Sequence, residues 1–479
     1  MAQDPANPDL VAFLGWEWSQ IGPTPETHYG HRNVILKDLD DDKIPARPIG
    51  ATNRKIQSAM ATGSSLGARA KLVTMDLGNA RYLIDLAYLQ NQVSGTPLCA
   101  EGVPERDLPL DCLDTAPTPK ELFEKLDDWA MSAIVVPHGT TWGLHTPARA
   151  DISLQLKPGL HDSARQFLYE VYSGHGNSEE YRSWRAEGPN SECPDPTPDY
   201  EPCCWRAGEI IRSRCDDPAS AECTERVEEA KRLYIEADTD GFLTIPGATT
   251  EDWKDCGQCR DCFAPAYSFR PGGSAQAALA AGDFSAGGDP LRFRFGLIAS
   301  SDNHSARPGT GYKEFDRQNM TDTIGTPDET THKLLMPDVE PTAQAVSAET
   351  AKRTWQGPVG PPPWDIERQG SFFLTGGLVA VHAAGRGRDA IWDALGRREV
   401  YGTSGERLLL WFDLIDGETS HPMGSVVTHA GPPRFRVRAV GAPVQNRDAL
   451  ITRRRRWGRS ASKPCATASA TTRATNGTR

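Results

Sequence analysis

Hydrophobic residues gather in short runs along this chain, separated by polar stretches rich in proline and glycine. Continuous apolar runs of about four to eight residues are typical of buried β-strands. The pattern therefore predicts a series of strands over residues 10–18, 31–36, 133–136, 167–172 and 292–300.

Segments in which apolar residues recur at helical spacing alternate with these runs. Leu122, Leu126 and Trp129 fall on one face, which predicts an amphipathic helix over residues 120–131, directly before the strand at 133–136. A helix that leads into a strand is typical of α/β folds, so we predict that class. Further helices are expected at 221–237 and 389–397, and a β-rich region at 408–415 and 434–440.

The charge of the chain is unevenly distributed. The 479 residues carry a formal net charge of −12, but residues 451–479 hold eight basic residues and no acid, so the preceding body carries −20. An acidic body repels nucleic acid at long range, which argues against a DNA or RNA partner. No run of about 18 apolar residues occurs, so we expect no membrane span.

Cysteine is concentrated in one segment. Of eleven cysteines, seven lie between Cys193 and Cys259, and Cys262 follows directly. Disulfides that stabilise a poorly cored insertion explain this best and predict a periplasmic or secreted protein, although residues 1–9 lack the features of a signal peptide. The Cys-x-x-Cys-x-x-Cys spacing from Cys256 to Cys262 leaves a structural zinc or iron–sulfur site open as an alternative.

Four short motifs carry candidate metal ligands. Glu17 ends an apolar run in GWE, His31 begins the next one in HRN, His138 follows a third in VPHG, and Asp302 and His304 follow a fourth in SSDNH. Each has an ordinary structural interpretation: a hydrogen-bonded histidine, a buried paired carboxylate or a turn cap. Their shared position at strand ends favours a site for zinc, manganese or iron, which bind carboxylate and imidazole ligands.

Together these motifs resemble those of the PHP (polymerase and histidinol phosphatase) metallohydrolases. The likeness is closer to their secreted relatives, the domain of unknown function 3604, and also covers residues 172–179 and 390–407 within a span of roughly 8–445. The resemblance implies a distorted (β/α)7 barrel with two or three divalent metal ions, used to hydrolyse phosphate esters.

The resemblance also implies which residues bind which metal ion. Glu17, His31 and His138 would hold one metal ion, while Asp302 and His304 would contribute to a second and a third. The His-x-His strand with which such proteins normally begin has no counterpart in this sequence. We therefore expect one complete centre, between one and three divalent ions, and a chain that is a fragment whose activity is impaired.

The predicted reaction is hydrolysis of a small anionic ester by a metal-activated water. We expect His175, Arg307 and Arg407 to contact the anionic group, although an ordinary ion pair explains either arginine equally well. Sulfate esters and phosphotriesters are neighbouring substrates, and the oligomeric state stays open. The alternatives are a nuclease, which the acidic body disfavours, and a non-catalytic binding protein on a degraded metallohydrolase scaffold.

The predicted domain organisation has five parts. The Cys-rich insertion divides the barrel, and the tail is read as disordered or translated out of frame because it lacks any hydrophobic pattern. The parts are the first barrel segment at 1–182, the insertion at 183–290, the last barrel segment at 291–407, the start of the β-rich region at 408–445, and the tail at 446–479.

Overall fold

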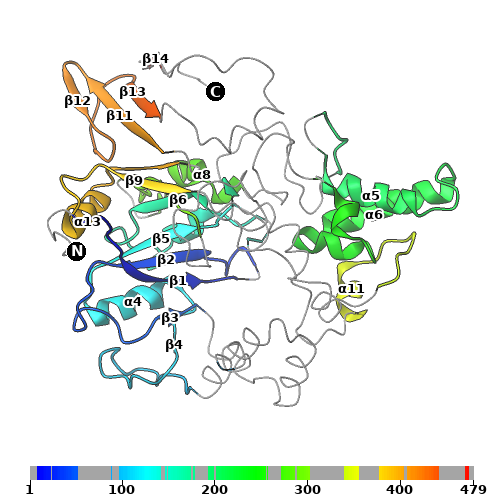
Figure 1. Ribbon diagram of the computed structural model, residues 1–479, viewed down its shortest axis with the longest axis horizontal. Helices are drawn as coiled ribbons and strands as arrows, with labels where there is room; N and C mark the ends of the chain where they lie inside the picture. The colour runs from blue at the N-terminus through cyan, green and yellow to red at the C-terminus, as the bar shows by residue number, and fades with distance from the viewer. Residues whose placement is uncertain are drawn as a thin grey trace.

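The structure is a computed structural model, and Figure 1 shows its layer of strands, a helical unit to one side of it and a C-terminal sheet. It describes residues 8–22, 24–51, 88, 96–141, 146–147, 149–173, 176–177, 192–198, 201–254, 256, 271–285, 289–302, 339–354, 377–403, 407–441 and 470–473.

The first sheet joins three strands in the order β1 (Leu14–Ser19), β2 (His31–Leu36) and β5 (Ala133–His138). Both pairings are antiparallel. All six residues of β5 are buried, which explains its continuous apolar sequence. The predicted strand at 31–36 is confirmed, and the predicted strand at 10–18 begins later than expected.

Helix α4 (Pro119–Trp129) covers one face of this sheet and confirms the helix predicted at 120–131. A capping box formed by Thr118 and Glu121 starts it, because each side chain satisfies a backbone N–H that the first turn leaves free. Its apolar face packs with Trp18 and Val34 in one buried cluster. Below it, β3 (Ile49–Gly50) and β4 (Asp114–Thr115) form a short parallel pair.

The layer continues beyond β5 with strands from distant parts of the chain. β6 (Leu168–Ser173) lies beside β5 and pairs in parallel with β8 (Gly296–Ala299), while β7 (Gly176–Asn177) pairs with the end of β6. Next to β8 lies β10 (Val400–Thr403), paired antiparallel with β9 (Leu378–Val381). A Cβ at Gly402 would lie 2.5 Å from the backbone nitrogen of Ala299, so only glycine permits this approach.

Helix α13 (Arg388–Gly396) packs against the far part of this layer and confirms the helix predicted at 389–397. Side chains from β5, β6, β8, β10 and α13 share one apolar cluster. In the described residues none of the sheets closes into a barrel, and β2 is antiparallel to both of its neighbours, β1 and β5. The (β/α)7 barrel therefore stays a prediction.

The helical unit contains part of the predicted Cys-rich insertion, whose bounds of 183–290 stay a prediction. It holds α5 (Cys203–Ser213), α6 (Ala221–Ala237), η2 (Asp238–Thr244) and α7 (Thr250–Trp253), and α11 (Ala348–Thr354) packs against η2. The helix predicted at 221–237 is confirmed, whereas α5 was not predicted. Three disulfides cross-link the unit, joining Cys193 to Cys204, Cys203 to Cys256 and Cys215 to Cys223.

A fourth disulfide joins Cys99 to Cys112. Four disulfides are typical of proteins from oxidising compartments, extracellular or periplasmic. Because Cys256 is bonded to Cys203, its thiolate does not serve the alternative zinc or iron–sulfur site. None of the described helices is both long and apolar enough to cross a membrane.

The remaining short helices, η1 (Ile152–Leu156), η3 (Pro271–Gly273) and α8 (Ala275–Ala280), pack near the end of β6. The C-terminal sheet has the order β12 (Thr419–His421), β11 (Leu408–Asp416), β13 (Arg434–Gly441) and β14 (Ala470–Arg473), which confirms the β-rich region. Apart from β14, the tail lies outside the described residues, so its predicted disorder stays a prediction.

Candidate metal centre

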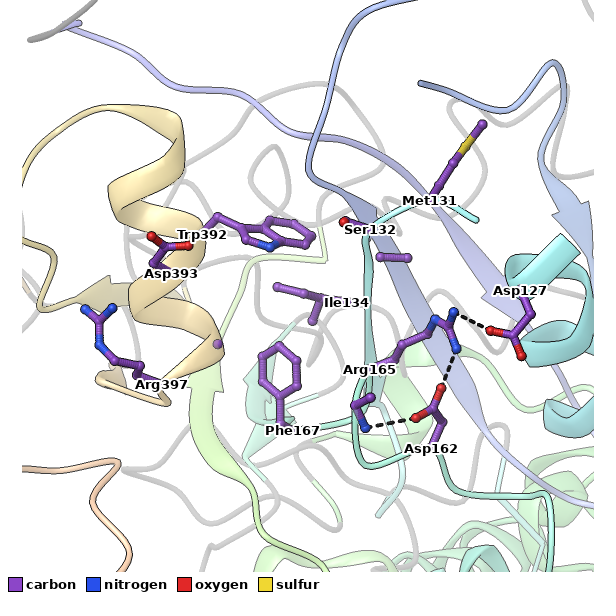
Figure 2. Close-up of a pocket in the computed structure, with 13 residues that line it drawn as sticks. Asp127, Met131, Ser132, Ile134, Asp162, Arg165, Phe167, Trp392, Asp393 and Arg397 are labelled. Carbon is purple, nitrogen blue, oxygen red and sulfur yellow. Dashed lines mark hydrogen bonds and ion pairs between the residues drawn. The ribbon is translucent and has the colours of Figure 1, made fainter. Parts of the chain in front are cut away.

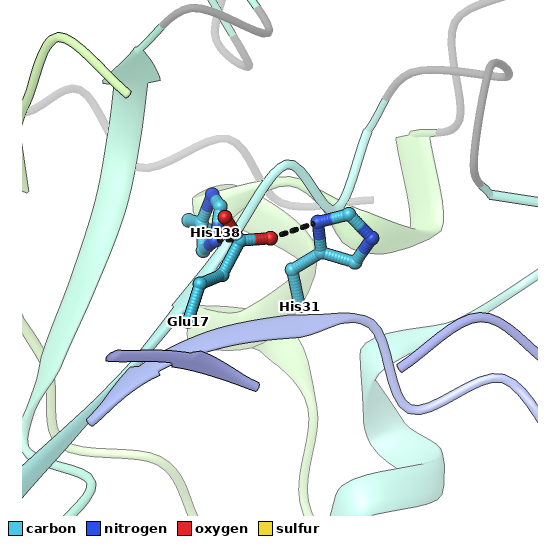
Figure 3. Close-up of side chains that lie close together, drawn as sticks. All are labelled: Glu17, His31 and His138. Carbon is cyan, nitrogen blue, oxygen red and sulfur yellow. Dashed lines mark ion pairs between the residues drawn. The ribbon is translucent and has the colours of Figure 1, made fainter. Parts of the chain in front are cut away.

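Three of the predicted ligands meet at one edge of the first sheet (Figure 3). The carboxylate oxygen Oε1 of Glu17 lies 2.8 Å from Nδ1 of His31 and 3.7 Å from Nε2 of His138. One ligand atom from each residue lies within 4.8 Å of the other two. The predicted grouping of these three residues is therefore present in the folded chain.

Strand pairing explains why residues so far apart in sequence converge. His31 begins β2 and His138 ends β5, and because these strands are antiparallel the two residues are direct register partners. β1 runs antiparallel to β2, so Glu17 near its end reaches the same edge. A ligand at the start of one strand and ligands near the ends of its neighbours thus face one point.

The centre is shielded from solvent on its histidine side. His138 is 0% exposed and His31 is 7% exposed, while the Glu17 side chain keeps 20% of its surface accessible. The hydroxyl of Ser19 donates a hydrogen bond of 2.7 Å to Oε1 of Glu17. An ion or molecule that approaches from solvent therefore reaches the carboxylate of Glu17 first.

The donor set fits a divalent transition metal ion. Two imidazoles and one carboxylate, with a position left open, are the ligands of many catalytic zinc sites. Metal–ligand bonds of about 2.1 Å in a tetrahedral arrangement separate neighbouring ligand atoms by about 3.4 Å. The separations of Glu17 from the two histidines, 2.8 and 3.7 Å, lie on either side of that value, and all three ligand atoms lie within 4.8 Å of one another.

Glu170 is a residue of the site that sequence reasoning missed. Its Oε1 lies 3.7 Å from Nδ1 of His138, the ring nitrogen opposite the one that faces Glu17. The hydroxyl of Ser300, just past β8, donates a hydrogen bond to Oε2 of Glu170. A lone acid in the middle of the buried strand FLYEVY was the available signal, because such a carboxylate needs a polar partner.

Two buried basic residues lie next to the centre. Burial, followed by the charge of His31, lowers the pKa of His28 to about 4, so His28 is neutral at physiological pH. Arg32 is fully buried, which lowers its pKa to about 9, and its guanidinium donates to the carbonyls of Tyr29 and Gly30. As neighbours in β2, Arg32 and His31 point to opposite faces, so this cation does not occupy the ligand face.

Of the other predicted site residues, the two that the structure describes, Asp302 and Arg407, do not belong to this three-residue group. Asp302 lies just past β8 in a left-handed conformation with φ of 47° and is not part of the three-residue group. Arg407 is exposed and directly precedes β11. His175, His304 and Arg307 lie outside the described residues, so their assignments stay predictions.

A cavity lies at the other end of the strands. It has a volume of about 830 Å³ and is bounded by the starts of β5 and β6 and by the end of α13 (Figure 2). Arg165 there pairs with Asp127 at 2.6 Å and with Asp162 at 2.5 Å. The carboxylates of Asp127 and Asp162 thus already have a cationic partner, whereas the carboxylate of Glu17 faces imidazoles.

Comparison with known proteins gives a partial assignment. Residues 281–413 match a family described as a protein of unknown function (DUF3604). The match covers well under half of the chain, including Asp302 and Arg407, and ends within β11; Glu17, His31 and His138 lie outside it. No curated protein and no solved structure is significantly similar to the chain.

Proposed function

We propose that this protein is a metal-dependent hydrolase of phosphate-type esters, built on a PHP-like barrel and working in the periplasm or outside the cell. The observation that carries the proposal is the convergence of Glu17, His31 and His138 from three strands on one buried point. The four disulfides support the compartment.

The reaction chemistry follows from the donor set. A zinc, manganese or iron ion, when bound, would supply the positive charge that acidifies a water molecule and neutralises the oxygens of an anionic ester. The imidazoles of His31 and His138 hold the buried side of the centre, and Glu17 offsets part of the added charge on the accessible side. His175, Arg307 and Arg407 are our proposed contacts for the ester anion.

Metal analysis combined with an ester assay tests this proposal. We expect the purified chain, dialysed against metal-free buffer, to retain about one zinc, manganese or iron ion and to hydrolyse nitrophenyl phosphate or bis(nitrophenyl) phosphate. A chelator should abolish turnover, and added metal should restore it. Nitrophenyl sulfate in parallel distinguishes phosphate from sulfate preference.

A matched pair of variants sharpens the test. His31→Ala should lose the ion, whereas His161→Ala should keep it, because His161 is a half-buried histidine outside the centre that packs edge-to-face against Phe293. A wild-type chain that binds no metal ion would overturn the proposal. Metal binding without turnover of any ester would favour the non-catalytic binding protein instead.

A further inference from the structure

We infer that Glu170 is a positioning residue for the metal centre, which holds His138 so that its Nε2 faces the ion, and that Ser300 holds Glu170 in turn. The inference deepens the proposed function and rests on it. Its starting point is the pair of contacts on opposite sides of the His138 ring: Glu17 lies 3.7 Å from Nε2, and Glu170 lies 3.7 Å from Nδ1.

An ion bound at Nε2 and the carboxylate of Glu170 at Nδ1 would favour the same tautomer of a neutral imidazole. A carboxylate that faces Nδ1 favours the proton on that nitrogen, because the N–H is attracted to the negative oxygen. The lone pair then resides on Nε2, which faces Glu17 and His31. The opposite tautomer would place a proton where the ion must bind, so Glu170 fixes both the identity and the direction of the donor atom.

The orientation of Glu170 is itself fixed by the fold. Its side chain is 1% exposed, and the hydroxyl of Ser300 donates to Oε2, the oxygen that does not face His138. The backbone N–H of Ser300 donates to the carbonyl of Tyr172 at 2.9 Å, which ties the start of the SSDNH segment to β6. This chain of contacts links β8, β6 and β5 to one ligand.

Charge supports the same role. A divalent ion in a buried site needs nearby negative charge to offset the loss of hydration. Glu17 supplies one negative charge within the ligand group, and Glu170 supplies a second on the far side of His138. Glu170 lies outside the three-residue ligand group, so it acts through His138 rather than on the ion.

The experiment measures the affinity for Zn²⁺ and Co²⁺ alone, by chelator competition, in Glu170→Gln and in Ser300→Ala. We expect Glu170→Gln to bind either ion about 10- to 100-fold more weakly, the range typical for loss of such an outer contact. Ser300→Ala retains the carboxylate and should lose less. The visible spectrum of Co²⁺ at saturation should shift in Glu170→Gln, because the donor geometry at His138 changes.

Glu105→Gln is the matched control. Glu105 is another buried carboxylate, paired with Lys125 away from the centre, so the same chemical change there should leave metal affinity and the Co²⁺ spectrum unchanged. Thermal melting of the metal-free variants separates loss of affinity from loss of folding. If Glu170→Gln does not fold, Ser300→Ala carries the test, and an affinity and spectrum equal to wild type would overturn the inference.

The possible failures are distinguishable. A folded Glu170→Gln protein with wild-type affinity and spectrum would overturn this inference alone and leave the metal centre standing. A wild-type chain that binds neither Zn²⁺ nor Co²⁺ would overturn the proposed function and this inference with it.

Discussion

The two ends of the strand layer differ in how their carboxylates are paired. At one end, Arg165 lies between Asp127 and Asp162, so both carboxylates already share a cationic partner beside a large cavity. At the other end, Glu17 faces His31 and His138, which are neutral donors unless protonated. The first arrangement already contains its cation, while the second is suited to receive one.

The comparison shows that cavity size is a poor guide to chemistry in this protein. The described cavity of about 830 Å³ is lined by both acidic and basic side chains and by aromatic side chains such as Trp392 and Phe167. The metal centre is a small cluster in which only one side chain is appreciably exposed. Donor type and charge balance, rather than volume, identify the candidate site.

Removing a ligand at the metal end should have the largest effect. We expect His138→Ala to lower the affinity for zinc by more than about 100-fold, beyond the loss typical of an outer contact, because one of three protein ligands is gone. Elemental analysis and chelator competition measure the loss. Unchanged metal stoichiometry in this variant would contradict the assignment of His138 as a ligand, and with it the difference between the two ends.

Disulfide removal should destabilise the helical unit without affecting the metal end. The Cys203–Cys256 bridge closes a separation of 53 residues, and chain entropy predicts that losing it costs about 4 kcal/mol of unfolding free energy. The Cys215–Cys223 bridge closes only 8 residues and should cost about 2.5 kcal/mol.

Paired serine substitutions and urea denaturation compare the two bridges. Metal affinity should be the same in both variants, because neither bridge reaches the strands that carry the ligands. A fall in affinity that tracks the loss of stability would mean that the helical unit supports the metal end.

A change at the opposite end should have a modest effect on stability alone. Arg165→Met removes both ion pairs and should lower the free energy of unfolding by about 1 kcal/mol, because Asp127 is largely exposed and its pairing is screened by solvent. Zinc affinity and ester turnover should equal those of wild type. Loss of turnover in the folded variant would place the active site at the large cavity.

The smallest effect concerns the buried carboxyl group of Glu105. Lys125 pairs with both Glu105 and Asp114, and burial, followed by the neighbouring Asp114, raises the pKa of Glu105 to about 7. A pKa raised on folding means that the folded chain holds the proton more tightly, so this contribution is complete below about pH 4.5 and is lost as the pH rises through 7.

We therefore expect Tm to fall slightly between pH 5 and pH 8, by an amount that Glu105→Gln removes. Melting curves at several pH values measure both slopes. Equal slopes in the two proteins would show that Glu105 ionises without cost, and its pair would then resemble the exposed charges around Arg165.

Sequence patterns predicted the local elements well where one signal dominated. The apolar run before His138 and the capped amphipathic helix α4 appear as expected. The three residues of the candidate centre were also singled out, because each follows or begins an apolar run. Helix α5 was missed because its cysteines suggested cross-links rather than helical periodicity.

Contacts between residues far apart in the chain could not be predicted from the sequence. Nothing local indicates that His31 lies opposite His138, or that Ser300 reaches Glu170 across 130 positions of the chain. Glu170 was overlooked because the strand around it looked purely structural. Its role depends on which ring nitrogen of His138 it faces, and only the folded chain fixes that relation.

The direct pairing of His31 with His138 has a consequence for folding. Successive residues of a strand point to opposite faces, so a slip of one position between β2 and β5 would turn a ligand away and dismantle the donor set. A metal ion would then bind only the correctly aligned sheet. By mass action, its presence would draw misaligned chains towards the native pairing. The ion would therefore select the correct register of the strands that bind it.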